Sequence, residues 1–183
     1  MKNILFLGRN SKKTKLINFL KNKNFKISCL NKSITLVKNI KKFDLIILFG
    51  YVGNLEKDDL KKCKRPIINL LTSYMPFNTE PNSNIWSFID NTPIGVTIHE
   101  INKSFDNKNI IFQKLIHFDL NKNKSLTLNQ FHKVLFIEVE NLFIKEFEKI
   151  ISFKYTTYKP IKVGIPQKIR EFPKHLIKNS RLF

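Results

Sequence analysis

Short apolar runs alternate with helical patterns through the first half of the chain. Ile4 to Leu7 and Leu45 to Phe49 are continuous apolar runs that end at a glycine, which predicts buried strands. Between them, Leu16, Ile17 and Leu20 recur at helical spacing. This alternation is typical of a parallel α/β sheet with helices on its faces. The other elements predicted in this half are strands at Phe25 to Leu30 and Pro66 to Leu71, and short helices at Leu36 to Ile40 and Asp58 to Leu60.

The second half begins with a proline- and asparagine-rich loop, Thr72 to Asn84, and a short helix, Ile85 to Ile89. Strands follow at Gly95 to Ile101 and Ile110 to Phe118. In the first of these, alternation sends Val96 and Ile98 to one face and Thr97, His99 and Ile101 to the other.

A long helix is the last strong element. Thr127 and Gln130 have the spacing of a capping box, and an apolar stripe runs from Phe131 to Ile151. We predict a Rossmann-like, mostly parallel sheet with flanking helices in a single domain, residues 1–155. Residues 156–183, which contain several prolines, are predicted to be an extended tail on the surface.

Composition supports a folded protein with one core. A chain of 183 residues that is 42% hydrophobic, with 17 phenylalanines, argues against disorder and has little room for a second full domain. No apolar run approaches the ~20 residues that cross a bilayer. The amino terminus lacks the long apolar stretch of a signal peptide, so the cytoplasm is the expected location.

The formal net charge of +19 raises the question of nucleic acid. The positive charge is spread along the chain and is almost entirely lysine. Arginine, which suits bidentate recognition of phosphates and bases, is scarce. We therefore expect a general attraction for anionic substrates and argue against a nucleic-acid partner. The only arginines are Arg9, Arg65, Arg170 and Arg181.

Several common site motifs are missing. Only Gly8 follows the first strand, so there is neither a dinucleotide fingerprint nor a P-loop. The four histidines show no metal-ligand spacing, and we predict no metal site. Cys29 and Cys63 lack paired spacing; two buried free thiols are expected, with one disulfide left as an alternative.

Three ordered segments carry a family resemblance: Asn69 to Pro76, Asn84 to Phe88, and Thr92 to His99. Together they resemble the formyltransferases that use N10-formyltetrahydrofolate, above all the short enzymes that formylate amino sugars carried on a nucleotide diphosphate. The segment Asp44 to Tyr51 resembles the family's sequence beside its folate-binding loop. The resemblance extends from the first strand to the end of the long helix.

The resemblance implies the chemistry and its residues. An amine attacks the formyl carbon of the folate, and an asparagine and a histidine stabilise the oxyanion that forms. An aspartate from a later loop orients the histidine and helps move the proton. By position, the asparagine is Asn69 and the aspartate is Asp106.

The position of the family's histidine holds Leu71, which can neither donate a hydrogen bond nor carry a proton. Two further departures lie nearby: Thr79-Glu80 replaces an Arg-Gly pair, and the aspartate loop, Asn102 to Asn109, lacks the family's glycines and its outer acids. His99 is the one candidate to substitute for the missing base, although relatives commonly carry a histidine there.

The resemblance also implies binding residues. Tyr51, Val52 and Met75 are predicted at the folate, and Ser73, Pro76 and Trp86 at the sugar nucleotide. Structural alternatives stay open: Asn69 could cap a turn, Asp106 could be a solvated loop acid, His99 could be a structural histidine, and Trp86 could be a core residue of its helix.

Two interpretations of function stay open. The first is an N-formyltransferase, and the second is a family member that has lost its chemistry and still binds a ligand. The sequence does not set the oligomeric state, for which a homodimer is one option.

Overall fold

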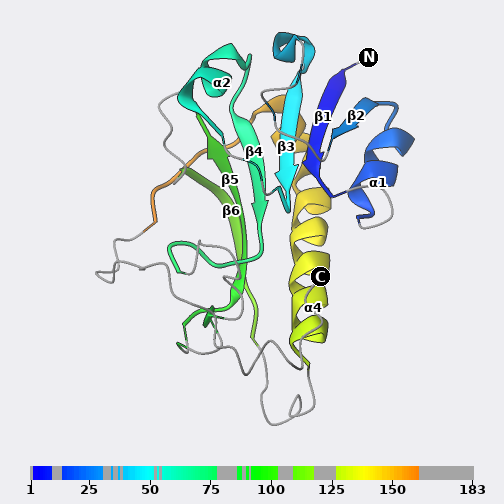
Figure 1. The fold of residues 1–183 in the computed structure, drawn as a ribbon. Helices are drawn as coiled ribbons and strands as arrows, with labels where there is room; N and C mark the ends of the chain where they lie inside the picture. Colours follow the sequence, from blue (N-terminus) through cyan, green and yellow to red (C-terminus); the bar gives the residue numbers. More distant parts are fainter. Residues whose placement is uncertain are drawn as a thin grey trace.

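The computed structural model describes residues 2–9, 14–30, 34, 37, 39–51, 53, 55–77, 86–87, 90, 92–102, 109–117 and 127–160. These residues form one six-stranded sheet in the order β2-β1-β3-β4-β5-β6 (Figure 1). The strands are β1 (Asn3–Gly8), β2 (Lys26–Leu30), β3 (Leu45–Phe49), β4 (Ile67–Leu71), β5 (Gly95–Ile101) and β6 (Asn109–Leu115).

The first four strands are parallel to one another, whereas β5 pairs antiparallel with β4 and β6 pairs antiparallel with β5. The predicted fold class, a mostly parallel sheet with flanking helices, is confirmed. The helices are α1 (Leu16–Asn22), the 3-10 turn η2 (Ile40–Lys42), α2 (Lys57–Lys62), α4 (Leu128–Lys145) and α5 (Phe147–Ser152).

Each face of the sheet has its own core. Alternate residues of the strands, such as Phe6 and Ile98, pack with α1, α4 and α5 in one apolar cluster. The residues between them, such as Leu5 and Ile67, pack with α2 and the η2 turn in a second cluster. We call these the α4 face and the α2 face (Figure 1). All of β3 is buried, as its continuous apolar run predicts.

The predicted long helix is interrupted, which the apolar stripe did not indicate. Its start is as predicted, because Thr127 and Gln130 form a capping box. At Glu146 the backbone leaves the helical region (φ −97°, ψ 11°), so α4 ends and α5 begins. The break lets Phe147 pack edge-on against Phe19 and Phe25, with ring centroids 5.1 and 5.6 Å apart.

Two other predictions are corrected. Cys29 was expected to be buried, but it is exposed because β2 lies at an edge of the sheet; Cys63 is buried, and neither cysteine forms a disulfide. The last strand ends at Leu115 instead of Phe118, and Ile116 N–H instead donates to the carbonyl of Ile94.

The described part of the carboxyl-terminal segment lies beside β6. Tyr158 forms an isolated antiparallel bridge with Ile110, with N–H···O distances of 2.9 and 3.0 Å. The domain boundary at residue 155 stays a prediction. Among the described residues, no helix is long and apolar enough to cross a membrane.

Candidate functional site

Asn69 and His99 meet on the α2 face of the sheet. They are register partners on β4 and β5, and Asn69 Nδ2 lies 2.8 Å from His99 Nε2. Asn69 is half-buried and His99 is 4% exposed. With the amide in this orientation, Asn69 Nδ2 donates and His99 Nε2 accepts, because an amide nitrogen only donates. The pair therefore orients the Asn69 side chain and leaves its second amide hydrogen for another acceptor.

Leu71 occupies the next position on the same face. It is the last residue of β4, it is half-buried, and it lies opposite Thr97 in the strand register. A polar side chain at this position would stand beside the Asn69–His99 pair, because residues two apart on a strand share a face. Leucine places an apolar surface there instead.

The loop after β4 is tied to β5 by Thr97. The Thr97 hydroxyl donates to the Ser73 carbonyl at 2.7 Å and accepts from Met75 N–H at 3.2 Å. Thr97 is fully buried, so these bonds are shielded from water. The loop continues into Pro76 through a cis peptide bond. Ser73 and Pro76, predicted at the substrate, and Met75, predicted at the folate, therefore lie together.

Ser73 has an unusual environment for a polar side chain. Its residue is 2% exposed, and its hydroxyl forms no hydrogen bond within the described part of the chain. Buried hydroxyls are nearly always bonded, so this one is a candidate ligand contact. Met75, by contrast, is an apolar residue of the buried core, 5% exposed, and has no such polar group to satisfy.

The remaining predicted residues are more dispersed. The Tyr51 hydroxyl accepts from Ile34 N–H at 3.0 Å, and its ring packs against the α2-face core, so its side chain has a structural role. Trp86 is half-buried, and its backbone carbonyl accepts a hydrogen bond from Asp90 N–H. Asp106 and Val52 lie outside the described residues.

Two site residues escaped the sequence analysis. Thr97 was placed on the correct face but given no role. Gln113, on β6 opposite Thr97, donates from Nε2 to Thr97 Oγ1 and to the Met75 carbonyl, each at 3.0 Å. The available signal was a polar residue that follows the apolar run Ile110 to Phe112 within the strand.

Arg9 marks the carboxyl end of β1 on the α4 face. Its guanidinium carbon lies 3.5 Å from the centroid of the Phe136 ring and 5.4 Å from that of Phe49. Burial lowers the pKa of Arg9, opposed by the negative charge of Glu140. Burial, and then the charge of Arg9, lowers the pKa of His132, whose ring packs edge-on against Phe136.

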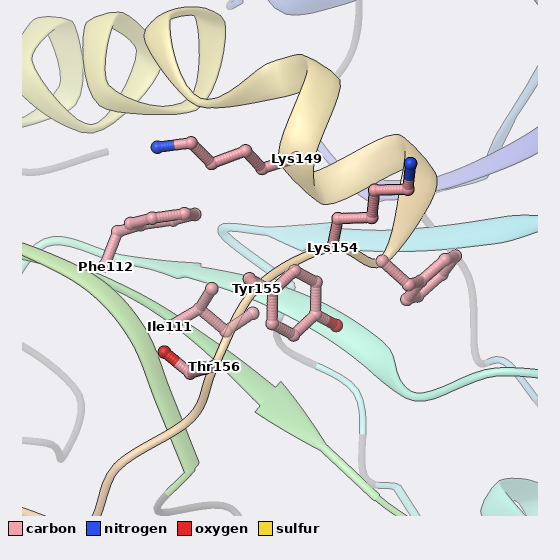
Figure 2. A pocket seen from close by; sticks show the side chains of 7 residues that line it. Ile111, Phe112, Lys149, Lys154, Tyr155 and Thr156 are labelled. Carbon is pink, nitrogen blue, oxygen red and sulfur yellow. The ribbon is translucent and has the colours of Figure 1, made fainter.

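An open groove of about 510 Å³ lies elsewhere, between β6 and α5 (Figure 2). Lys149 reaches over Phe112, with Nζ 5.5 Å from the ring centroid, and Tyr155 and Thr156 form the opposite wall. None of the predicted site residues within the described part of the chain lines it. No cluster that could hold a metal ion occurs among the described residues.

Fold and site together define an α/β protein with a polar site at the junction of its parallel and antiparallel strands. No protein-family model matches the chain. Among solved structures, it is 30% identical to the formyltransferase PseJ from Anoxybacillus kamchatkensis, crystallised in complex with UDP-4,6-dideoxy-4-formamido-L-AltNAc and tetrahydrofolate. The match covers 91% of this chain and 86% of that one, with a TM-score of 0.76. The chain belongs to the sugar N-formyltransferases, the family that its sequence resembles.

Two more distant structures share the fold. A 4-N formyltransferase from Francisella tularensis is 22% identical, with a TM-score of 0.69 over 97% of this chain and 78% of that one. An N-formyltransferase from Helicobacter canadensis, complexed with folinic acid and dTDP-3-aminofucose, is 18% identical. Its TM-score is 0.67 over 87% of this chain and 67% of that one.

Proposed function

We propose that this chain transfers the formyl group of N10-formyltetrahydrofolate to the amine of a nucleotide-linked amino sugar. The observation that carries the proposal is the Asn69–His99 pair at 2.8 Å, beside a loop whose Ser73 hydroxyl is buried without a partner in the described chain. The relative PseJ, whose complex holds a formylated sugar nucleotide and tetrahydrofolate, supports the choice of both substrates.

The reaction needs an oriented hydrogen-bond donor. The amine lone pair attacks the formyl carbon, the carbonyl electrons move to oxygen, and a tetrahedral oxyanion forms. When it collapses, the bond to the folate nitrogen breaks, that nitrogen takes up a proton, and the former amine loses one. The second Nδ2 hydrogen of Asn69, held in place by His99, is our candidate donor to the oxyanion. Such donors contribute about 10²–10³ in rate.

His99 and Asp106 have different roles in this proposal. His99 Nε2 is engaged by the Asn69 amide, which favours an orienting role over removal of the amine proton. Asp106 is the candidate proton acceptor, and its loop lies outside the described residues.

Leu71 favours a second candidate, a protein that binds one or both substrates without turnover. At this position leucine supplies no donor to the oxyanion and no path for a proton. The two candidates predict the same ligands and differ only in whether product forms.

The test is a product assay with the purified chain, N10-formyltetrahydrofolate and a panel of nucleotide-linked amino sugars. Mass spectrometry should detect a sugar nucleotide that carries a formyl group in place of one amine hydrogen. Asn69→Ala should lower the rate about 10²-fold or more. Lys154→Ala, at the exposed rim of the separate groove, is the matched control and should be unchanged.

Binding separates the two candidates. Titration with tetrahydrofolate and with a sugar nucleotide should show saturable binding in both cases. Binding without product across the whole panel would favour the second candidate, whereas the absence of binding and of product would overturn both.

A further inference from the structure

The Thr97 hydroxyl has no spare hydrogen-bonding capacity. It donates to the Ser73 carbonyl at 2.7 Å and accepts from Met75 N–H at 3.2 Å and from Gln113 Nε2 at 3.0 Å. One donor and two acceptor sites are all that a hydroxyl offers. The position of the loop after β4 therefore depends on which group Gln113 presents to Thr97.

The orientation of the Gln113 amide is set by partners on both of its sides. Nε2 uses its two hydrogens on the Met75 carbonyl and Thr97, both at 3.0 Å. Oε1 accepts from the Tyr158 hydroxyl at 3.2 Å. A reversed amide would place an oxygen against the Met75 carbonyl oxygen, and two acceptors repel each other.

Tyr158 is itself held by backbone bonds. Its N–H and carbonyl both bond to Ile110 of β6, at 3.0 and 2.9 Å. Burial and the neighbouring Tyr74 raise the pKa of Tyr158, which keeps the hydroxyl protonated and able to donate. A continuous chain of hydrogen bonds thus runs from the carboxyl-terminal segment through Gln113 to the loop at Ser73 and Met75.

We propose that Gln113 is a positioning residue for the site, and that Tyr158 locks its amide so that the carboxyl-terminal segment sets the shape of the Ser73–Pro76 loop. The consequence for ligand binding rests on the proposed function, since that is what places a substrate at this loop. The consequence for the loop itself does not rest on the proposed function, and it can be measured without any ligand.

Hydrogen exchange at the Met75 amide is the direct readout, because that N–H donates to Thr97. Gln113→Glu removes both donated hydrogens while keeping the shape of the side chain, and it should speed exchange at Met75 about tenfold. Tyr158→Phe leaves those hydrogens in place and only frees the amide to turn, so we expect a smaller rise of about two- to threefold. Exchange within β4 and the global melting temperature of Tyr158→Phe should be unchanged.

Tyr155→Phe is the matched control. Tyr155 lies on the same segment, but its hydroxyl donates to Glu100 at 3.1 Å and not to Gln113. This variant should leave Met75 exchange unchanged. Equal acceleration of Met75 exchange in Tyr155→Phe and Tyr158→Phe would contradict the proposal. Unchanged Met75 exchange in Tyr158→Phe, a variant that leaves Gln113 itself intact, would also contradict it.

A second readout ties the loop to the ligand. With the sugar nucleotide, Tyr158→Phe should raise the dissociation constant about two- to threefold, and any turnover should show the change in KM with kcat preserved. If the wild-type chain binds no ligand, the proposed function fails while the exchange result still decides the role of Gln113. Accelerated Met75 exchange with an unaltered affinity for the sugar nucleotide would confine the effect to the loop. That result would overturn the role of Gln113 in positioning the substrate.

Discussion

The two faces of β4 and β5 are made from alternating residues of the same short segments, yet they differ in kind. Toward α4 the strands present Ile68, Leu70, Val96 and Ile98, which join the apolar core. Toward α2, near the carboxyl end of β4, they present Asn69, Leu71, Thr97 and His99. Because successive residues of a strand point to opposite faces, one face can pack against a helix while the other carries polar side chains. Near the carboxyl end of β4, apolar packing therefore lies on the α4 face and the hydrogen bonds lie on the α2 face, which has its own apolar core further along the strands.

The largest effect should come from the apolar face. Phe143 is fully buried in the α4-face core, so Phe143→Ala should lower the free energy of unfolding by about 3–5 kcal/mol. Urea denaturation measures this. On the same helix, Ile137 is 50% exposed, and Ile137→Ala should change stability by no more than about 0.5 kcal/mol. Similar losses in the two variants would contradict the assignment of the faces.

The polar face should respond to loss of a single hydroxyl. Thr97→Val keeps the shape but leaves the Ser73 carbonyl and Met75 N–H without their partner, at a cost of about 1–3 kcal/mol. Thr156→Val, at an exposed position, serves as the control for the chemical change. Thermal or urea unfolding compares them. A fully stable Thr97→Val protein would mean that the loop is held by other contacts.

The contribution of His132, on α4, to stability should depend on pH. Burial and Arg9 lower the pKa of His132 below its ordinary 6.5. A histidine with a lowered folded-state pKa contributes stability above pH 6.5, and that contribution is lost as the pH falls through 6.5 and then through the folded value. His132→Phe should therefore show a smaller drop in melting temperature than the wild type on acidification. An equal drop in His132→Phe and in the wild type would contradict this environment of His132.

The smallest effect is expected at the far edge of the sheet. Burial, and then the carboxylate of Glu100, raises the pKa of Tyr155 well above 10. Its neutral form is favoured in the folded state, so its contribution to stability is present below pH 10 and declines as the pH rises further. In a spectroscopic titration of tyrosinate, Tyr155→Phe should remove a tyrosine that ionises well above pH 10. Loss of a tyrosine that ionises near pH 10 would contradict this environment of Tyr155.

Much of this could be predicted because strands are periodic. The alternation in Gly95 to Ile101 placed His99 and Thr97 on one face, and the resemblance pointed to Asn69 as a site residue. Its pairing with His99 came from the strand register, which the sequence did not give. The helix break at Glu146 could not be predicted, since the apolar stripe continues across it and only the packing of Phe147 on α1 reveals it. Gln113 was missed for a similar reason: its importance comes from partners 16, 38 and 45 residues away in the chain.

Product formation by the wild type and Leu71→His, measured side by side, tests the central claim most directly. Leu71 lies beside Thr97 on the face that carries Asn69 and His99, so an imidazole there would join the proposed oxyanion site. The account predicts that Leu71→His raises the rate of formyl transfer about 10²-fold or more over the wild type. A well-folded Leu71→His protein that binds both substrates and forms no more product than the wild type would contradict it.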